Sequence, residues 1–211
     1  MNQQHTFALE FLEVLPIEDL IGCNVLDVGA GPGYQTQWLR EKGVDAVAVD
    51  VKAPIVDVPF ISCNAHGLAK KFGKMHVDAI WSHHALEHME SHMDVLRQFH
   101  RVLREGGWLY LTVPQIDNVI SEGHIVSFTM PLVLYQLAIC GFDLSTAKWG
   151  KFRSHLRVAV QAGDIPKDTS LRALQLPAAA AAAVEQTGRF DASHVPNNWF
   201  TLPAPGATSG P

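Results

Sequence analysis

The chain has 211 residues, of which 47% are apolar and 18% charged, and its 16 basic and 21 acidic side chains give a formal net charge of −5. A chain of this length buries roughly 70% of the surface that its unfolded form exposes, so one domain can be stable without disulfides or a structural metal. The negative charge gives no overall attraction to phosphate groups, which argues against nucleic acid as a partner.

Three further features bear on the compartment. The cysteines, Cys23, Cys63 and Cys140, are odd in number and far apart, as is typical of reduced thiols. The longest apolar run, residues 131–140, falls well short of the roughly 20 residues of a membrane span. The first residues lack the basic segment and the continuous apolar stretch of a signal peptide. We therefore expect a cytoplasmic protein that does not enter a membrane.

The chain begins with a helical pattern and then turns to strands. Apolar residues at helical spacing predict an N-terminal helix over residues 7–15. Residues 24–28 predict a buried strand, which runs directly into the glycine turn Gly29-Ala30-Gly31-Pro32-Gly33 and a helix over residues 34–42. This order is strand, glycine turn, helix.

Further buried strands are predicted at residues 44–51, 77–82 and 108–113, each apolar on both faces as parallel strands are. Ser91 and Asp94 have the spacing of a capping box, which predicts a helix that ends at the pair Gly106 and Gly107. Strands that alternate with helices in this way indicate an α/β fold.

The last third of the chain changes in character. An apolar helix is predicted over residues 131–140, and two strands over 142–149 and 155–161 are expected to pair antiparallel at one sheet edge, with a turn at Gly150. Residues 164–211 are rich in Ala and Pro, which predicts a C-terminal extension that is helical at best and partly disordered.

The glycine turn is a place where backbone can approach a ligand closely, because glycine has no Cβ and tolerates positive φ. The dinucleotide fingerprint G-x-G-x-x-G requires a third glycine where this chain has Tyr34. A site for NAD is therefore disfavoured.

The string VLDVGAGPGYQT at residues 25–36 resembles the first motif of the class I S-adenosylmethionine-dependent methyltransferases, of the type-11 kind, whose turn is G-x-G-x-G. Two later strings, VDAIWSHHALEHM and VLREGGWLYLTVP, resemble that family's fourth strand with its following loop and its fifth strand. The resemblance covers about residues 25–161. It implies a Rossmann-like, doubly wound, mostly parallel seven-stranded sheet with an antiparallel edge strand, and a methyltransferase domain over residues 1–163.

The resemblance also implies the cofactor, S-adenosyl-L-methionine, and the residues that hold it. Asp50 ends the second predicted strand, where the family's acidic residue binds the ribose hydroxyls, and a carboxylate suits a diol. Asn64 stands where the family often has an Asp for the adenine amino group. Asp27 lies near the methionine part or caps the turn internally. The full set is Asp27, Gly29, Ala30, Gly31, Gly33, Asp50, Val51, Asn64, Ala65, Ser82 and His83.

Residues 84–88, His-Ala-Leu-Glu-His, match the inverted zinc-protease motif H-x-x-E-H. That chemistry needs both histidines on one helical face and a third ligand from elsewhere. Because the string follows a buried strand of a glycine-turn α/β fold, in the place where the resembling family carries a similar L-E-H string, we expect no metal ligands here. Zinc hydrolysis is kept as an alternative.

His124 and His84 are the predicted catalytic residues. His124 falls between the fifth and sixth strands, where similar methyltransferases often place a histidine at the start of a substrate-facing helix; it orients the acceptor, acts as a base or simply caps that helix. His84 follows the fourth strand with Ser82 and His83, and this loop either borders the ligand or packs against the glycine turn.

The predicted reaction is in-line transfer of a methyl group from a sulfonium, in which the protein chiefly aligns the acceptor and excludes water. The Asn/Asp-Pro-Pro-aromatic string of nucleobase amino methyltransferases and the Pro-Cys pair of the cytosine-C5 type are missing. A small molecule, lipid precursor or sugar is therefore the expected acceptor. A binding or scaffold protein of the same fold without turnover is the other alternative. The oligomeric state is left open.

Overall fold

The computed structural model describes residues 17–74, 77–115, 123–152, 154–165 and 200–201. The helix predicted over residues 7–15 lies outside these ranges, as does most of the extension after residue 164. The boundary between a domain and an extension at residues 163 and 164 therefore stays a prediction.

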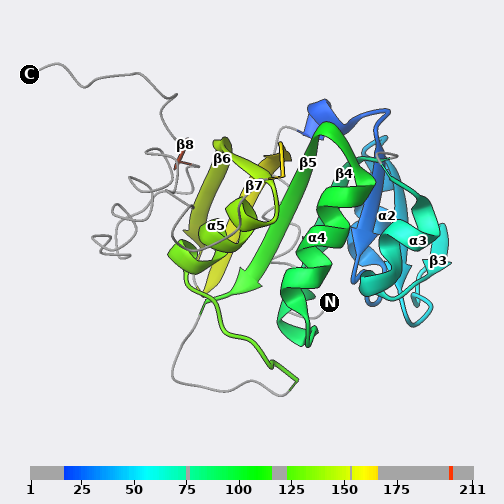
Figure 1. Ribbon diagram of the computed structural model, residues 1–211. Helices are drawn as coiled ribbons and strands as arrows, with labels where there is room; N and C mark the ends of the chain where they lie inside the picture. Colours follow the sequence, from blue (N-terminus) through cyan, green and yellow to red (C-terminus); the bar gives the residue numbers. More distant parts are fainter. Residues whose placement is uncertain (1–16, 75–76, 116–122, 153, 166–199, 202–211) are drawn as a thin grey trace, which may run out of the picture.

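In the described part of the chain, one sheet of eight strands has the order β3-β2-β1-β4-β5-β7-β6-β8 (Figure 1). The strands are β1 (Asn24–Val28), β2 (Asp45–Asp50), β3 (Phe60–Ser62), β4 (Val77–His83), β5 (Leu103–Pro114), β6 (Phe142–Phe152), β7 (His155–Ala162) and β8 (Phe200–Thr201). Neighbours from β3 to β5 are parallel, β7 runs antiparallel between β5 and β6, and β8 pairs antiparallel with β6 at the edge. The predicted α/β, Rossmann-like sheet is confirmed.

Helices cover both faces of this sheet. They are α2 (Tyr34–Glu41), α3 (Leu68–Phe72), α4 (His92–Val102) and α5 (Met130–Ile139), with the short 3-10 helices η1 (Ile17–Leu20), η2 (Ala65–Gly67) and η3 (Leu86–His88). Helices α3, α4 and α5 share one buried apolar cluster with the sheet, whereas α2 and η1 share a second cluster with its other face (Figure 1).

Successive strand residues supply the two faces, since side chains alternate along a strand. In β4, Ile80 packs with α4 and α5 while its neighbours Ala79 and Trp81 pack with α2 and η1. Both sides are completely buried, which explains why the strand is a continuous apolar run.

Helix α4 starts where the sequence predicts, but the predicted side-chain cap at its start does not form. Ser91 is its N-cap residue, yet its side chain makes no capping hydrogen bond, so the predicted capping box with Asp94 is wrong. The helix also ends at Val102, before the two glycines, because β5 begins at Leu103 and pairs there with Val77. Gly106 and Gly107 lie inside β5 and accommodate the irregular register between β4 and β5.

The antiparallel pair is longer than predicted. Gly150 does not form the turn; β6 continues through it to Phe152, and Gly150 pairs with Arg157 of β7. The connection is therefore at residues 153–154. Phe200 and Thr201 pair with Trp149 and Lys148, so this part of the extension is a strand rather than the helix or disorder expected there.

Candidate functional site

The glycine turn after β1 is built so that one of its three glycines faces open space. A Cβ on Gly29 would lie 2.3 Å from the Cβ of Ala85, and a Cβ on Gly33 would lie 2.7 Å from the Cβ of Pro54. A Cβ on Gly31 would meet no atom within 4 Å. Gly29 and Gly33 are therefore required by packing within the protein, and only the space above Gly31 is available to a ligand.

Hydrogen bonds to the end of β2 fix the path of this turn. The amides of Gly29 and Ala30 donate to the carbonyl of Val49 at 2.8 and 3.4 Å, and the amide of Gly31 donates to Oδ2 of Asp50 at 2.9 Å. Oδ1 of Asp50 accepts the amide of Lys52 at 3.2 Å. Since a carboxylate oxygen accepts two hydrogen bonds, one position remains on each oxygen of Asp50. The acid thus points at the turn, and its predicted contact with ribose hydroxyls stays a prediction.

Asp27 is buried beneath the turn. Its Oδ2 accepts the hydroxyl of Thr36 in α2 at 2.6 Å, and burial raises the pKa of Asp27 to about 7 against the opposing effect of this bond. The bond ties the end of β1 to the first turn of α2, on the far side of the glycine turn. Its predicted contact with the methionine part of a cofactor stays a prediction.

The residues predicted for the adenine lie beyond β2 and β3. Val51 follows Asp50 and is 60% exposed. Oδ1 of Asn64 accepts the amide of His66 at 3.0 Å and faces Nδ1 of the same residue at 2.8 Å, so it caps η2. Ala65 is buried as the first residue of that helix.

The end of β4 carries polar atoms that the described residues do not satisfy. Oγ of Ser82, Nδ1 of His83 and Nε2 of His84 are buried, and none has a hydrogen-bond partner within the described part of the chain. Burial, and then the neighbouring His84, His155 and Arg157, lower the pKa of His83 well below its ordinary value. Buried polar atoms of this kind mark places where a ligand or water completes the bonding.

His84 has a strained backbone, with φ at 50°, in the left-handed region that non-glycine residues rarely adopt. Its amide donates to the carbonyl of Thr112 at the end of β5. The next residue, Ala85, is the one that fills the space at Gly29, so this loop packs directly on the glycine turn.

Glu87 brings the two predicted catalytic histidines together. Its side chain is fully buried, and its Oε1 accepts Nδ1 of His84 at 2.9 Å. Nε2 of His124 lies 4.0 Å from the same oxygen. Neither Glu87 nor His88 was predicted as a site residue; both belong to the string at residues 84–88, which suggested only a zinc motif.

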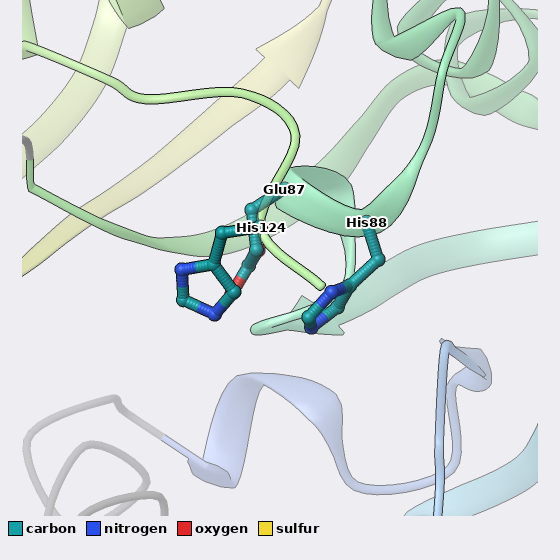
Figure 2. Close-up of side chains that lie close together, drawn as sticks. All are labelled: Glu87, His88 and His124. Atoms are coloured by element: carbon teal, nitrogen blue, oxygen red, sulfur yellow. The ribbon is translucent and has the colours of Figure 1, made fainter. Parts of the chain in front are cut away.

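His88 completes this group. Its Nδ1 donates to the carbonyl of Gly123 at 2.8 Å, and its ring lies edge-on to that of His124 with centroids 5.0 Å apart. Figure 2 shows the side chains of Glu87, His88 and His124 gathered on one side of η3. Ligand atoms of these three residues lie within 4.8 Å of one another. We call these three residues the Glu-His-His cluster.

Two alternatives from the sequence fail on this geometry. His84 precedes η3 with left-handed φ, so His84 and His88 do not share a helical face and the arrangement of the zinc-protease motif is missing. His124 does not cap α5, because Thr129 is its N-cap residue and accepts the amide of Leu132.

Residues 26–111, from β1 to β5, match the family described as the methyltransferase domain. Over these residues, which are less than half of the chain, the sequence is similar to a methyltransferase domain. The family predicted from the glycine turn and the two later motifs is confirmed. The match begins at the strand before the glycine turn and ends in β5, so the turn, the acid of β2 and the loop after β4 all lie within the matched residues.

Relatives of known activity match over parts of this domain. The chain is 42% identical to magnesium-protoporphyrin O-methyltransferase of Rhodobacter capsulatus over 53 residues. This aligned segment covers 25% of this chain and 23% of that protein. The chain is 29% identical to malonyl-[acyl-carrier protein] O-methyltransferase 1 of Coxiella burnetii over 125 residues. This alignment covers 55% of this chain and 42% of that protein. The chain spans less than half the length of these curated relatives.

Solved structures share the fold of the methyltransferase domain. A methyltransferase from Archaeoglobus fulgidus, described as SAM dependent, superposes with a TM-score of 0.64 at 13% identity, covering 76% of this chain and 95% of the other. The 1,6-didemethyltoxoflavin-N1-methyltransferase of Burkholderia thailandensis, solved with S-adenosylhomocysteine, gives 0.58 at 20% identity, with coverages of 76% and 77%. Among the helices that the structure describes, none has the length and apolar character to cross a membrane.

Proposed function

We propose that this chain binds S-adenosyl-L-methionine at the glycine turn and transfers its methyl group to an oxygen atom of a small-molecule acceptor. The observation that carries the proposal is the open space above Gly31, next to a carboxylate, Asp50, that already faces the turn. The family match supports the cofactor, and the two O-methyltransferases among the relatives support oxygen as the methylated atom.

The described residues fit the cofactor. Each oxygen of Asp50 keeps one free acceptor position, so the two hydroxyls of a ribose can donate to the same carboxylate. The exposed Val51 offers an apolar surface for the adenine ring, beside Asn64 and the amide of Ala65. The unsatisfied atoms of Ser82 and His83 offer polar partners near the methionine end.

When bound, S-adenosylmethionine supplies a methyl group on a positively charged sulfur, which is already a good leaving group. The chain's own residues then have to hold the acceptor in line with that methyl group and keep water away. His84 and His124 are proposed to face the acceptor, because both lie at Glu87 on the loops that follow β4 and β5. These loops lie at the carboxyl ends of the strands, where α/β sheets bind ligands.

The acceptor is proposed to be a small molecule, a lipid precursor or a sugar rather than nucleic acid, in keeping with the net charge of −5. A reducing compartment, the cytoplasm, is part of the proposal, and all three cysteines are free thiols. A scaffold that binds the cofactor without turnover is the remaining alternative.

Calorimetric titration with S-adenosylhomocysteine tests the cofactor site. We expect Asp50→Ala to weaken binding by about tenfold or more, because two charge-assisted hydrogen bonds to the ribose are lost. Asp45→Ala is the matched control: it removes an aspartate from the other end of β2, where Asp45 pairs with Arg40 at the surface. No heat with either S-adenosylhomocysteine or S-adenosylmethionine at millimolar concentration would refute the proposal.

Turnover needs a second measurement. The chain is incubated with S-adenosylmethionine carrying a labelled methyl group and with fractionated small molecules from cell extract. Label that base treatment releases identifies a methyl ester. Label that survives base treatment excludes an ester, and the NMR shift of the methyl group then distinguishes an ether from an N-methyl or C-methyl product. Binding without transfer to any fraction would favour the scaffold alternative.

A further inference from the structure

We infer that the Glu-His-His cluster, Glu87, His88 and His124, is a site for one divalent transition-metal ion that holds the acceptor's oxygen. This inference rests on the proposed oxygen methylation. It departs from the sequence-based expectation that the chain has no metal ligands, because that expectation considered only the helical motif of residues 84–88.

The first observation is the convergence of ligand atoms. One carboxylate and two imidazoles, from η3 and from the segment before α5, lie within 4.8 Å of one another. An ion bound at about 2.0–2.2 Å from each ligand atom brings such atoms to roughly 3–4 Å from each other. A closure of about 1 Å therefore completes the site, and His88 and His124 are exposed enough for their rings to move by that amount.

The second observation is an unsatisfied acceptor. Glu87 is completely buried, and its Oε2 has no hydrogen-bond partner within the residues that the structure describes. Leaving a carboxylate oxygen buried and unbonded is unfavourable. Because the other oxygen, Oε1, is held by Nδ1 of His84, a cation at the cluster would meet a carboxylate already fixed in direction.

The third observation concerns which ring nitrogen of His88 is free to bind an ion. Its Nδ1 donates to the carbonyl of Gly123, which fixes the tautomer and leaves Nε2 with a lone pair for an ion. A second bond, from the amide of Ile125 to the carbonyl of Glu87 at 2.9 Å, holds the segment that carries His124 against η3. His88 and the segment that carries His124 are thus positioned by backbone contacts, and the carboxylate of Glu87 is positioned by His84.

The ligand types indicate the class of ion and its role. Two imidazoles and one carboxylate suit Mn²⁺, Fe²⁺, Co²⁺ or Zn²⁺ better than Mg²⁺ or Ca²⁺, which prefer oxygen ligands. Three protein ligands leave coordination positions for an acceptor with two adjacent oxygens, such as a vicinal diol or a hydroxycarboxylate. The ion lowers the pKa of the bound hydroxyl, whose proton passes to water. The oxygen then forms the O–C bond while the S–C bond breaks and its electron pair remains on sulfur.

Titration of the metal-free chain with ZnCl₂, MnCl₂ and MgCl₂, without cofactor, tests the site. We expect one Zn²⁺ or Mn²⁺ per chain, bound at least about tenfold more tightly than Mg²⁺. Visible absorption bands after addition of CoCl₂ give a spectroscopic readout of the same site. Glu87→Gln keeps the shape of the side chain, and His124→Ala removes a partly exposed one; each should weaken binding by about 100-fold.

His66→Ala is the matched control, since it removes a histidine that pairs with Asn64 outside the cluster and should leave the affinity unchanged. Stoichiometric binding that survives both cluster variants, or no binding at millimolar metal, would overturn the inference. S-adenosylhomocysteine titrated into the same preparations separates the two proposals. If it binds while the metals do not, the metal site is wrong and the proposed function stands. If the metals bind while it does not, the proposed function is refuted, and with it the ion's role toward an acceptor, while the metal site itself stands.

Discussion

Gly31 differs from the other glycines of its turn in what surrounds it. At Gly29 and Gly33 a side chain would collide with Ala85 and Pro54, whereas at Gly31 it would enter the space assigned to the cofactor. Positive φ at Gly31, 52°, adds a conformational penalty that any side chain would carry. The effect of a substitution on binding can therefore be separated from its effect on folding by choosing a second glycine with the same penalty.

Gly31→Ala and Gly22→Ala form such a pair. Gly22 also has positive φ, 75°, and open space, but it lies before β1, at the opposite end of that strand from the turn. Both variants should lose about 1 kcal/mol of unfolding free energy in urea titrations. Only Gly31→Ala should weaken S-adenosylhomocysteine binding, by about tenfold or more, since a Cβ enters the pocket. Equal affinities for the two variants would contradict this account of the pocket.

The raised pKa of Asp27 predicts that the free energy of unfolding depends on pH. Burial raises its pKa from 3.8 to about 7, so between these values the folded chain holds a proton that the unfolded chain has released. The contribution of Asp27 to the free energy of unfolding is therefore fully present below pH 3.8 and is lost as the pH rises to about 7. The slope is at most about 1.4 kcal/mol per pH unit.

Asp27→Asn removes this titration while keeping an oxygen that accepts the hydroxyl of Thr36. Urea unfolding of both proteins at several pH values between 5 and 8, without cofactor, measures the difference. We expect the wild type to lose stability relative to the variant up to about pH 7 and to level off above it. Parallel pH profiles would show that the carboxyl of Asp27 is ionised throughout.

At the scale of elements, helices α4 and α5 begin in different ways. Thr129 caps α5 through its hydroxyl, which accepts the amide of Leu132 at 3.4 Å, whereas Ser91 occupies the N-cap of α4 without a side-chain bond. Helix α4 is held by its packing face instead, where Val95, Phe99 and others are completely buried. Packing of an amphipathic face contributes more to helix stability than a cap does.

Thr129→Ala should therefore lower the unfolding free energy by about 1 kcal/mol, because an amide at the start of α5 loses its acceptor. Ser91→Ala should change it by less than about 0.5 kcal/mol, as for an ordinary surface substitution. Urea titrations of the two variants at one pH give both values. A larger loss for Ser91→Ala would mean that the capping box expected from the sequence does form.

For the whole molecule, net charge sets which partners can approach. With a charge of −5, the chain gains little from release of counterions around DNA or RNA. In fluorescence anisotropy with labelled duplex and single-stranded DNA, at about 150 mM salt, we expect no binding below roughly 100 μM protein. Micromolar binding that falls steeply with added salt would reveal a basic surface and would contradict the proposed small-molecule acceptor.

The positions of β1, β2, β4 and β5 along the chain and of the glycine turn were predictable from the sequence alone, since a parallel strand buried on both faces is a continuous apolar run and the glycines mark the turn. Limits of elements were less well predicted. Gly150 was expected to end β6, yet it lies inside the strand because Arg157 of β7 pairs with it. Pairing across the sheet decides such limits, and it involves residues that are not adjacent in sequence.

The positions of Asp50 and of the glycine turn were predictable because they belong to one continuous stretch of strand, turn, helix and strand. Glu87 and His88 were not, because their role depends on His124, which is brought to them by the hydrogen bonds of Gly123 and Ile125 to η3. Tertiary structure alone decided that contact, since two loops far apart in the chain meet only when β4 and β5 pair and align their carboxyl ends.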